Sequence, residues 1–201
     1  MGKTIGKIIS SASQIEYICQ VYGKGEVANP PTPEDYRFGA WVKVPVGSLP
    51  DTYAVGVISD TQLHNPDYGV FGPRLSTPEQ LEVFSPDYLN ETAVLVRVLV
   101  LGQVSGGKKT AVGFCYVHPE IGALVSRMEN KEIAAFHRGE DGFDIGYYSL
   151  MLSMRSPLAQ ALLMSVLDDL ADVIPDAGPI LNALRANLAW QSQIRMAAGE
   201  R

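Results

Sequence analysis

Residues Ala93 to Lys109, AVLVRVLVLGQVSGGKK, decide the fold of this chain. The first nine residues, Ala93 to Leu101, are all apolar except Arg97. This run is too short for a membrane span and rich in β-branched side chains, so it predicts a buried β-strand. The glycine-rich segment Gly102–Lys109 then predicts a sharp turn, which returns the chain into a second strand, Thr110–Val117.

The same turn differs by one residue from the phosphate-binding motif G-x-x-x-x-G-K-[ST]. Lys109 stands where a hydroxyl should bind Mg²⁺, and a cation at that position would repel the metal ion. A working phosphate loop also opens a helix, whose N-terminal amides hold the phosphates, whereas Thr110–Val117 has a strand composition. We therefore expect a hairpin turn, no nucleotide or other cofactor, and no enzymatic activity.

The composition fits a chain that can bury a full core, with 201 residues of which 46% are hydrophobic. Charged residues make up only 19%, which suggests that part of the surface is covered in an assembly. The net charge of -6 lacks the basic field that supports nucleic-acid binding, so we expect no direct contact with nucleic acid. Cys19 and Cys115 are not spaced as metal ligands, and we expect buried free thiols and no metal.

The first residues run directly into a strand pattern without a secretory leader, and no apolar run is long enough for a membrane helix. We therefore expect a cytoplasmic protein that does not contact a membrane.

Four further strands precede the central pair, and two long loops rich in proline and glycine interrupt the series. The strands are expected at Thr4–Ser10, Ile15–Tyr22, Trp41–Val46 and Thr52–Ser59, and the loops at Gly23–Gly39 and Thr61–Asn90. Six short strands without alternating helices favour a small closed antiparallel β-barrel, because closure removes exposed strand edges.

The last third of the chain changes to helical periodicity. A short helix is expected at Glu129–His137 with Gly139 as its C-cap, then an extended piece from Phe143 to about Met154, then helices at Leu158–Ile174 and Ile180–Ala197 around the breaker Pro175–Pro179. The predicted class is mainly β with C-terminal α: a barrel domain over residues 1–155, then a helical hairpin over residues 156–201.

In this order the segments resemble a known family. The quoted pieces are Ile5–Ser10, Phe38–Val44, Ala54–Ile58, Val98–Gly102, His118–Val125 and Gly142–Gly146. Together they are similar to the N-terminal barrel (HAS-barrel type) of HerA-like DNA translocases, a barrel type shared with rotary ATP synthase subunits. The likeness covers roughly residues 4 to 150.

The resemblance implies a barrel without a motor. In those translocases a phosphate loop should follow soon after the Phe143 segment, but here Pro157 and the helical pattern stand in its place. The family's barrel forms the collar of a ring and helps to dock a nuclease. The resemblance thus implies a homo-oligomer, or a docking subunit for a translocase or nuclease, and no catalytic residue of the family has a counterpart here.

Few residues qualify as site candidates. Leu184, Leu188 and Trp190 are open to two interpretations, as core of the hairpin or as interface anchors. Asp168 and Asp172 share a helix face, but no third metal ligand is visible nearby. His64, His118 and His137 have no ligand-like spacing.

Three functions follow from these patterns. We expect a non-enzymatic assembly or partner-docking module, accessory to a DNA-processing motor or nuclease. The alternative is a small-molecule-binding protein or enzyme that uses the loops 23–39 and 61–90. A third, weaker possibility is single-strand nucleic-acid binding through Tyr36, Tyr68 and Phe71.

Overall fold

The computed structural model describes residues 2–65, 93–139, 142–154 and 156–197, with side chains as far as residue 191. Six antiparallel strands form a closed barrel in the order β1-β7-β3-β4-β5-β2, and the pairing of β2 with β5 closes the ring. These strands are β1 (Thr4–Ser11), β2 (Glu16–Val21), β3 (Trp41–Pro45), β4 (Thr52–His64), β5 (Ala93–Ser105) and β7 (Leu124–Arg127). The predicted class is confirmed.

Strand β5 is continuously apolar from Val98 to Leu101 because this part of the strand is buried on both of its faces. Val96, Val98 and Val100 belong to the cluster of side chains inside the barrel. Leu99 and Leu101 point the other way, into a second cluster between the barrel wall and the helices. Since successive side chains of a strand alternate between its faces, only a strand covered on both sides tolerates so long an apolar run.

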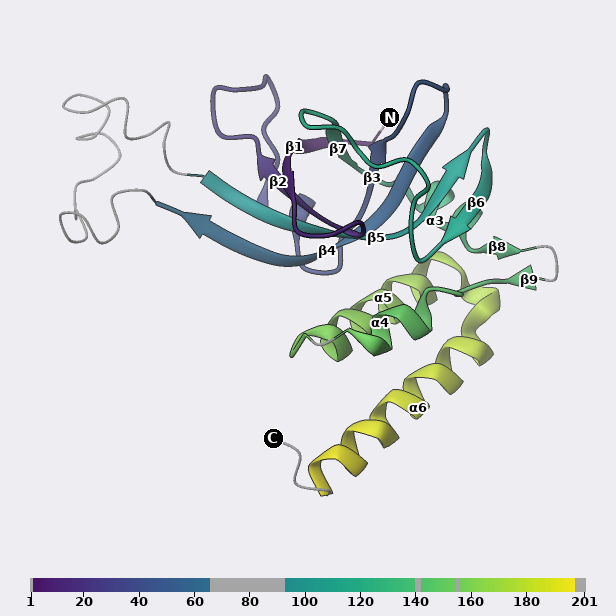
Figure 1. Ribbon diagram of the computed structural model, residues 1–201. Helices are drawn as coiled ribbons and strands as arrows, with labels where there is room; N and C mark the ends of the chain where they lie inside the picture. Colours follow the sequence, from purple (N-terminus) through teal and green to yellow (C-terminus); the bar gives the residue numbers. More distant parts are fainter. Residues whose placement is uncertain (1, 66–92, 140–141, 155, 198–201) are drawn as a thin grey trace.

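The helices lie together on one side of the barrel (Figure 1). They are α3 (Asn130–Phe136), α4 (Tyr148–Ser153), α5 (Ala159–Val173) and α6 (Gly178–Ala197), joined by the short strands β8 (Arg138–Gly139) and β9 (Gly142–Phe143) and by the 3-10 turn η2 (Pro175–Ala177); a second 3-10 turn, η1 (Pro33–Tyr36), lies in the long loop before β3. Trp41 projects from β3 into this layer and is fully buried against Phe136, His137 and Tyr147.

Helices α5 and α6 form the expected antiparallel hairpin. The Arg185 guanidinium donates to the carbonyl of Leu167 at 3.1 Å and pairs with Asp168 at 2.7 Å. The Gln160 amide donates to the carbonyl of Leu188 at 3.1 Å. The hairpin shares one apolar cluster with the barrel wall and α3.

The predicted number of barrel strands was right, but one of the expected members is replaced by another strand. Strand β6 (Lys108–Val112) pairs only with β5 and lies outside the closed ring, and it ends five residues earlier than expected, because Gly113 adopts a positive φ of 81°. The sixth barrel strand is β7, a four-residue segment too short to show an alternating pattern in the sequence.

Other expected boundaries were also wrong. Strand β4 runs to His64, into the predicted loop Thr61–Asn90, whose residues 66–90 lie outside the described part of the chain. Half of the expected extended piece Phe143–Met154 forms α4, and the C-cap of α3 is His137 instead of Gly139. In each case tertiary contacts override a weak local preference.

Gly102 lies within β5, not at the predicted turn, and marks a β-bulge. The register against β4 shifts there, since Val55 pairs with Gly102 and Gly56 with Val100. A Cβ atom on Gly102 would lie 2.5 Å from the carbonyl oxygen of Ala111 and 2.9 Å from the Phe136 ring. The bulge therefore allows Phe136 to pack directly on the backbone of β5.

Gly102→Ala should destabilise the fold by about 1–3 kcal/mol, because the added methyl group collides with backbone and with a buried ring. Gly178→Ala is the matched control. At Gly178 no atom lies within 4 Å of the position that an added methyl group would take, and the φ of -45° is helical, so that change should be neutral or stabilise by up to about 1 kcal/mol. Urea unfolding of both variants checks this, and equal stabilities would contradict it.

Candidate functional site

The glycine-lysine turn is a two-residue hairpin, as predicted. Ser105 pairs with Lys108, and both Gly106 and Gly107 have positive φ values, 56° and 76°, which this tight turn requires. Strand β6 follows instead of a helix, so the backbone amides do not converge on a phosphate position. Lys109 forms an ion pair with Asp144 and lies 5.4 Å from the centre of the Phe136 ring.

The three interface candidates on α6 separate by burial. Leu188 is fully buried and Leu184 half-buried, and both pack within the chain's own apolar cluster between barrel and helices. Trp190 is 61% exposed on the opposite side of the helix. Of the three residues, Trp190 alone is available to a partner in this structure.

The metal-ligand candidates are not brought together. Asp168 pairs with Arg185, whereas Asp172 is exposed at the end of α5. His64 and His118 are exposed, and His137 is buried in the aromatic cluster. In the described residues no group of three or more acidic, histidine or cysteine side chains is arranged to hold a metal ion. Both cysteines are buried and free, as expected.

The first of the two loops expected to carry a small-molecule site does not line a cavity described here. The three main cavities of the described chain have no lining residue from Gly23–Gly39. Tyr36 is half-buried against the barrel core, and Tyr68 and Phe71 lie outside the described residues. The loop is instead held by ion pairs, Lys3 to Asp35 at 2.7 Å and Arg37 to Asp169 at 2.6 Å.

His137 and Tyr147 form the buried polar centre of the helical layer. The Nδ1 atom of His137 lies 2.7 Å from the carbonyl oxygen of Ile133 and must donate to it, so Nε2 accepts from the Tyr147 hydroxyl at 2.6 Å. Burial lowers the pKa of His137 to about 4 and raises the pKa of Tyr147. Both groups are thus neutral and mutually satisfied, which is typical of a structural network.

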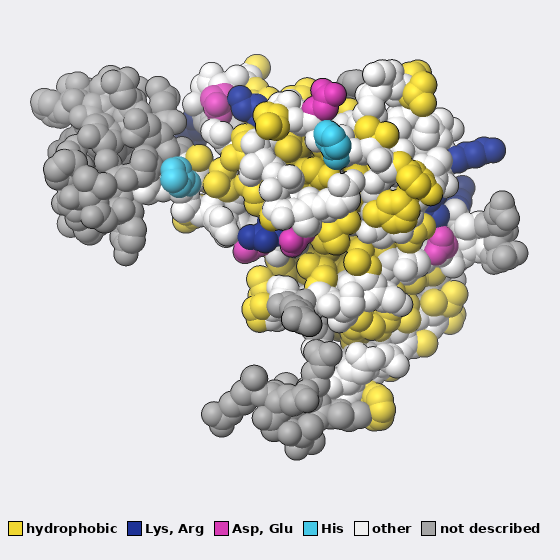
Figure 2. Space-filling view, viewed as in Figure 1, with side chains coloured by type: hydrophobic (Ala, Val, Ile, Leu, Met, Phe, Trp, Pro, Cys, Tyr) yellow, Lys and Arg dark blue, Asp and Glu magenta, His cyan; other side chains and the backbone are white. Residues whose placement is uncertain are grey.

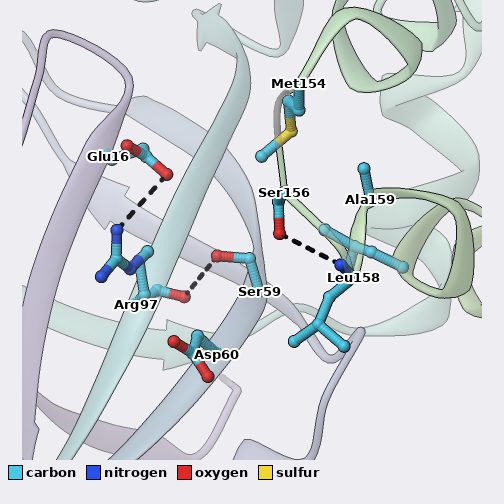
Figure 3. A pocket seen from close by; sticks show the side chains of 9 residues that line it. Glu16, Ser59, Asp60, Arg97, Met154, Ser156, Leu158 and Ala159 are labelled. Carbon is cyan, nitrogen blue, oxygen red and sulfur yellow. Dashed lines mark hydrogen bonds and ion pairs between the residues drawn. The ribbon is translucent and has the colours of Figure 1, made fainter. Parts of the chain in front are cut away.

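A polar cavity of about 180 Å³ lies where α5 begins beneath the barrel (Figure 3). Arg97 of β5 lies 3.7 Å from the Glu16 carboxylate, and its buried Nε has no hydrogen-bond partner among the described protein atoms. The Ser59 hydroxyl donates its proton to the carbonyl of Arg97 at 3.3 Å. A carbonyl oxygen is not a general base, so this contact does not activate Ser59 as a nucleophile. Met154 and Leu158 face these groups from the helical side (Figure 3). A smaller cavity, about 140 Å³, lies between α4, α5 and α6.

The segment from Gly113 to Ala123, here called the end loop, folds across one end of the barrel. Cys115 inserts into the barrel core, where burial raises the pKa of its thiol and leaves it inert. The buried Gln103 side chain accepts a hydrogen bond from the backbone N–H of Tyr116 at 2.8 Å, and Gln14 donates to the carbonyl of Cys115 at 3.4 Å. These anchors fix the loop from both sides.

Anchoring Cys115 inward turns its neighbours outward. Phe114 and Tyr116 flank it and contact each other edge-to-face at 5.0 Å. Five of the ten large exposed hydrophobic side chains in the described residues lie within eleven positions, an apolar end surface made of Phe114, Tyr116, Val117, Ile121 and Leu124. Figure 2 shows hydrophobic side chains gathered on this face, with most charged groups nearer its margins.

A groove of about 580 Å³ borders this surface. One wall comes from the β1–β2 hairpin and the other from the end loop; the lining residues are Ile8, Ser10, Ser11, Ser13, Gln14, Tyr17, His118, Pro119, Glu120 and Ile121. The Tyr17 hydroxyl donates to the carbonyl of Gln14 at 3.0 Å, and burial raises its pKa to about 12. The phenol therefore stays protonated and cannot act as a base at neutral pH.

Serine, histidine and glutamate side chains meet in this groove without forming a catalytic arrangement. The Nδ1 atom of His118 lies 3.1 Å from the carbonyl oxygen of Pro119, and the Ser13 hydroxyl accepts from the N–H of Ile15 at 3.3 Å. Among the described hydrogen bonds none joins a groove serine to His118, so the nucleophile–base contact of a hydrolase is not made here.

Sequence reasoning missed this groove. The sequence predicts only a turn at Ser11–Gln14, and it predicts a strand where the end loop begins. The sequence feature that could have pointed to the groove is Phe114–Val117, where Cys115 stands between two aromatic residues just after a glycine. Such a pattern suggests that neighbouring side chains point in different directions, but it does not show which of them are buried.

Lowering the pH from 7.5 to 5 should destabilise the protein by roughly 2 kcal/mol through His137. The unfolded imidazole binds a proton near pH 6.5 and the folded one near pH 4, so this stability is present above pH 6.5 and is lost as the pH falls towards 4. Urea unfolding at both pH values measures it. His137→Gln should flatten the dependence, whereas Asp176→Asn, an exposed control, should not.

Lys108→Ala should change neither nucleotide binding nor thermal stability by a measurable amount, since the exposed Lys108 sits at a hairpin tip. Titration with ATP and Mg²⁺, followed by phosphate release, is the measurement. ATP turnover by the wild type that disappears in the variant would contradict the hairpin assignment.

In the described part of the chain, no helix combines the length and apolar character needed to cross a membrane.

Comparison with known proteins assigns the chain to a family whose function is not known. No curated protein matches the sequence. One family model, described as a domain of unknown function (DUF8166), matches residues 2–198. Because that match covers nearly the whole sequence, barrel and helical hairpin together, the chain belongs to the DUF8166 family.

Proposed function

We propose that this protein is a non-enzymatic assembly or partner-docking module that binds other polypeptides at the end of its barrel. The observation that carries the proposal is the apolar end surface, where Tyr116 and Ile121 are 68% and 81% exposed. Monomeric soluble proteins rarely gather so many large apolar side chains on one exposed segment unless it meets a partner. The low fraction of charged residues agrees with a covered surface.

The hydrogen bonds and the buried side chain that hold the end loop in place support a docking role. Gln103 and Gln14 fasten its backbone, and Cys115 anchors it in the core. The exposed rings are therefore presented on a fixed frame, and a partner that covers them does not have to order the loop first. Interfaces favour rigid, amphipathic aromatic anchors of this kind.

The resemblance to the HerA-type collar suggests the setting. A closed six-stranded antiparallel barrel is the architecture that the resemblance implies, and such collars assemble into rings and dock nucleases. On that basis we propose self-assembly, or attachment to a DNA-processing motor or nuclease in the cytoplasm, with no direct grip on nucleic acid. Since small barrels serve many functions, this setting rests on family likeness alone.

A small-molecule-binding role is the second candidate, and the groove favours it. Its volume lies in the range of ligand pockets, and several polar side chains converge on it. It lies between Ser10–Gln14 and the end loop, and among the described residues neither loop 23–39 nor residues 61–65 contribute to its lining.

The double variant Tyr116→Ser, Ile121→Ser should lose assembly without losing its fold. Both side chains are mostly exposed, so each change should cost less than about 0.5 kcal/mol of stability. Size-exclusion chromatography with light scattering should show oligomers that grow with concentration for the wild type and a monomer for the variant. Leu63→Ser, which changes an exposed leucine near the end of β4, is the matched control.

A partner-docking role without self-assembly is tested by crosslinking in native cells, where proteins linked to the wild type should be missing from the double variant. A wild type that stays monomeric at every concentration, with the same proteins crosslinked to both forms, would contradict the proposal.

A further inference from the structure

The groove lies where two neighbouring strands of the barrel part. Strand β1 pairs with β7 as far as Lys7 and Leu124, and the last bonds between them join Ile8 to the backbone of Ala123 and Gly122, at 2.9 and 2.8 Å. Beyond this point β1 continues to Ser11, while the end loop turns away to His118 and Pro119. The cavity occupies the resulting gap.

The parting leaves one edge of β1 without a strand beside it. On its other edge β1 remains paired with β2, through Ser10 with Ile18 and Ser11 with Tyr17. On the groove side, β7 is the strand that pairs with β1 within the described residues, and that ladder has ended by Ile8. A strand held on one edge and open on the other offers backbone donors and acceptors to an added strand.

The side chains of the groove suit an extended backbone. The hydroxyls of Ser10, Ser11 and Ser13 and the amide of Gln14 line the hairpin wall, and groups of these types both donate and accept. They match the alternating N–H and C=O groups of a peptide. Side chains of an extended segment alternate in direction, so every second one would point into the groove.

Charge and apolarity define the inward side chains. Ile8 and Tyr17, which belong to the barrel core, line the hairpin side of the groove, and Ile121 is largely exposed on the other wall, which together suit an aliphatic side chain. Glu120 is the only carboxylate among the ten lining residues, which include no lysine or arginine. Since the whole chain carries a net charge of -6, the complementary segment is basic.

We propose that this groove binds an extended, basic polypeptide segment as an added strand along Ser10 and Ser11 of β1. The bound segment places an aliphatic side chain between Ile8 and Ile121, and a lysine or arginine two residues away next to Glu120. This site deepens the docking role proposed above and rests on it: the apolar end surface supplies contact area, and the groove supplies the recognition of sequence.

Selection from a random heptapeptide phage library against the full chain tests the site. Enriched sequences should alternate aliphatic residues with polar ones and carry a lysine or arginine. A synthetic peptide with the enriched sequence should then bind in fluorescence polarisation. Its Kd should rise at least tenfold with Glu120→Gln, and should not change with Asp176→Asn, an exposed carboxylate beside α6.

A second measurement separates strand addition from simple adhesion. Methylating alternate backbone amides of the peptide in the two possible registers should abolish binding in one register and spare it in the other, because only one set of amides faces β1. Failure to enrich any sequence, binding that ignores Glu120→Gln, or equal binding of both methylated peptides would each overturn the proposal.

The two proposals fail separately. If no peptide binds but the Tyr116, Ile121 double variant loses assembly, docking stands and the strand site is wrong. If peptides bind as expected while that variant assembles like the wild type, the end surface is wrong as the docking surface. If no peptide binds in the groove but a small polar metabolite raises the melting temperature of the protein in a thermal-shift screen, the strand site is wrong and the small-molecule role is favoured.

Discussion

The burial of β5 on both faces is the constraint on which the rest of the structure depends. Val96, Val98 and Val100 fill the barrel, whereas Leu99 and Leu101 face the helices, so one strand is shared by two apolar clusters. Removing either layer would expose a continuous apolar face to water, at about 25 cal/mol per Å² of apolar surface. The barrel and the helical layer are therefore obliged to form together, which agrees with a family match that spans both.

The helices pack closely against the barrel wall, and two features of the wall allow this. The bulge at Gly102 lets Phe136 pack on bare backbone, and Trp41 reaches from β3 into the ring cluster around His137. Because His137 and Tyr147 satisfy each other, this polar pair is buried without a charge. The buried histidine thus serves the fold.

The end loop follows from the same logic of inside and outside. The end of the barrel is filled by Cys115, whose small side chain is buried in the barrel core. Hydrogen bonds from Gln14 and to Gln103 hold the backbone on either side of it. Phe114 and Tyr116 lie on either side of Cys115 and remain exposed while its own side chain is buried. The protein therefore presents an apolar surface beside the groove at this end of the barrel.

The sequence alone determined what depends on local pattern: the apolar run of β5, the paired glycines of its hairpin, the barrel class and the helix-breaker-helix end. These features are set by side-chain periodicity and backbone sterics within a few residues. Only the tertiary structure decided that β7 closes the ring in place of β6, that Leu188 packs inside while Trp190 stays outside, and that Ser10 meets Glu120 across a groove. These outcomes depend on contacts between distant segments, and a local pattern shows that a face is apolar but not what covers it.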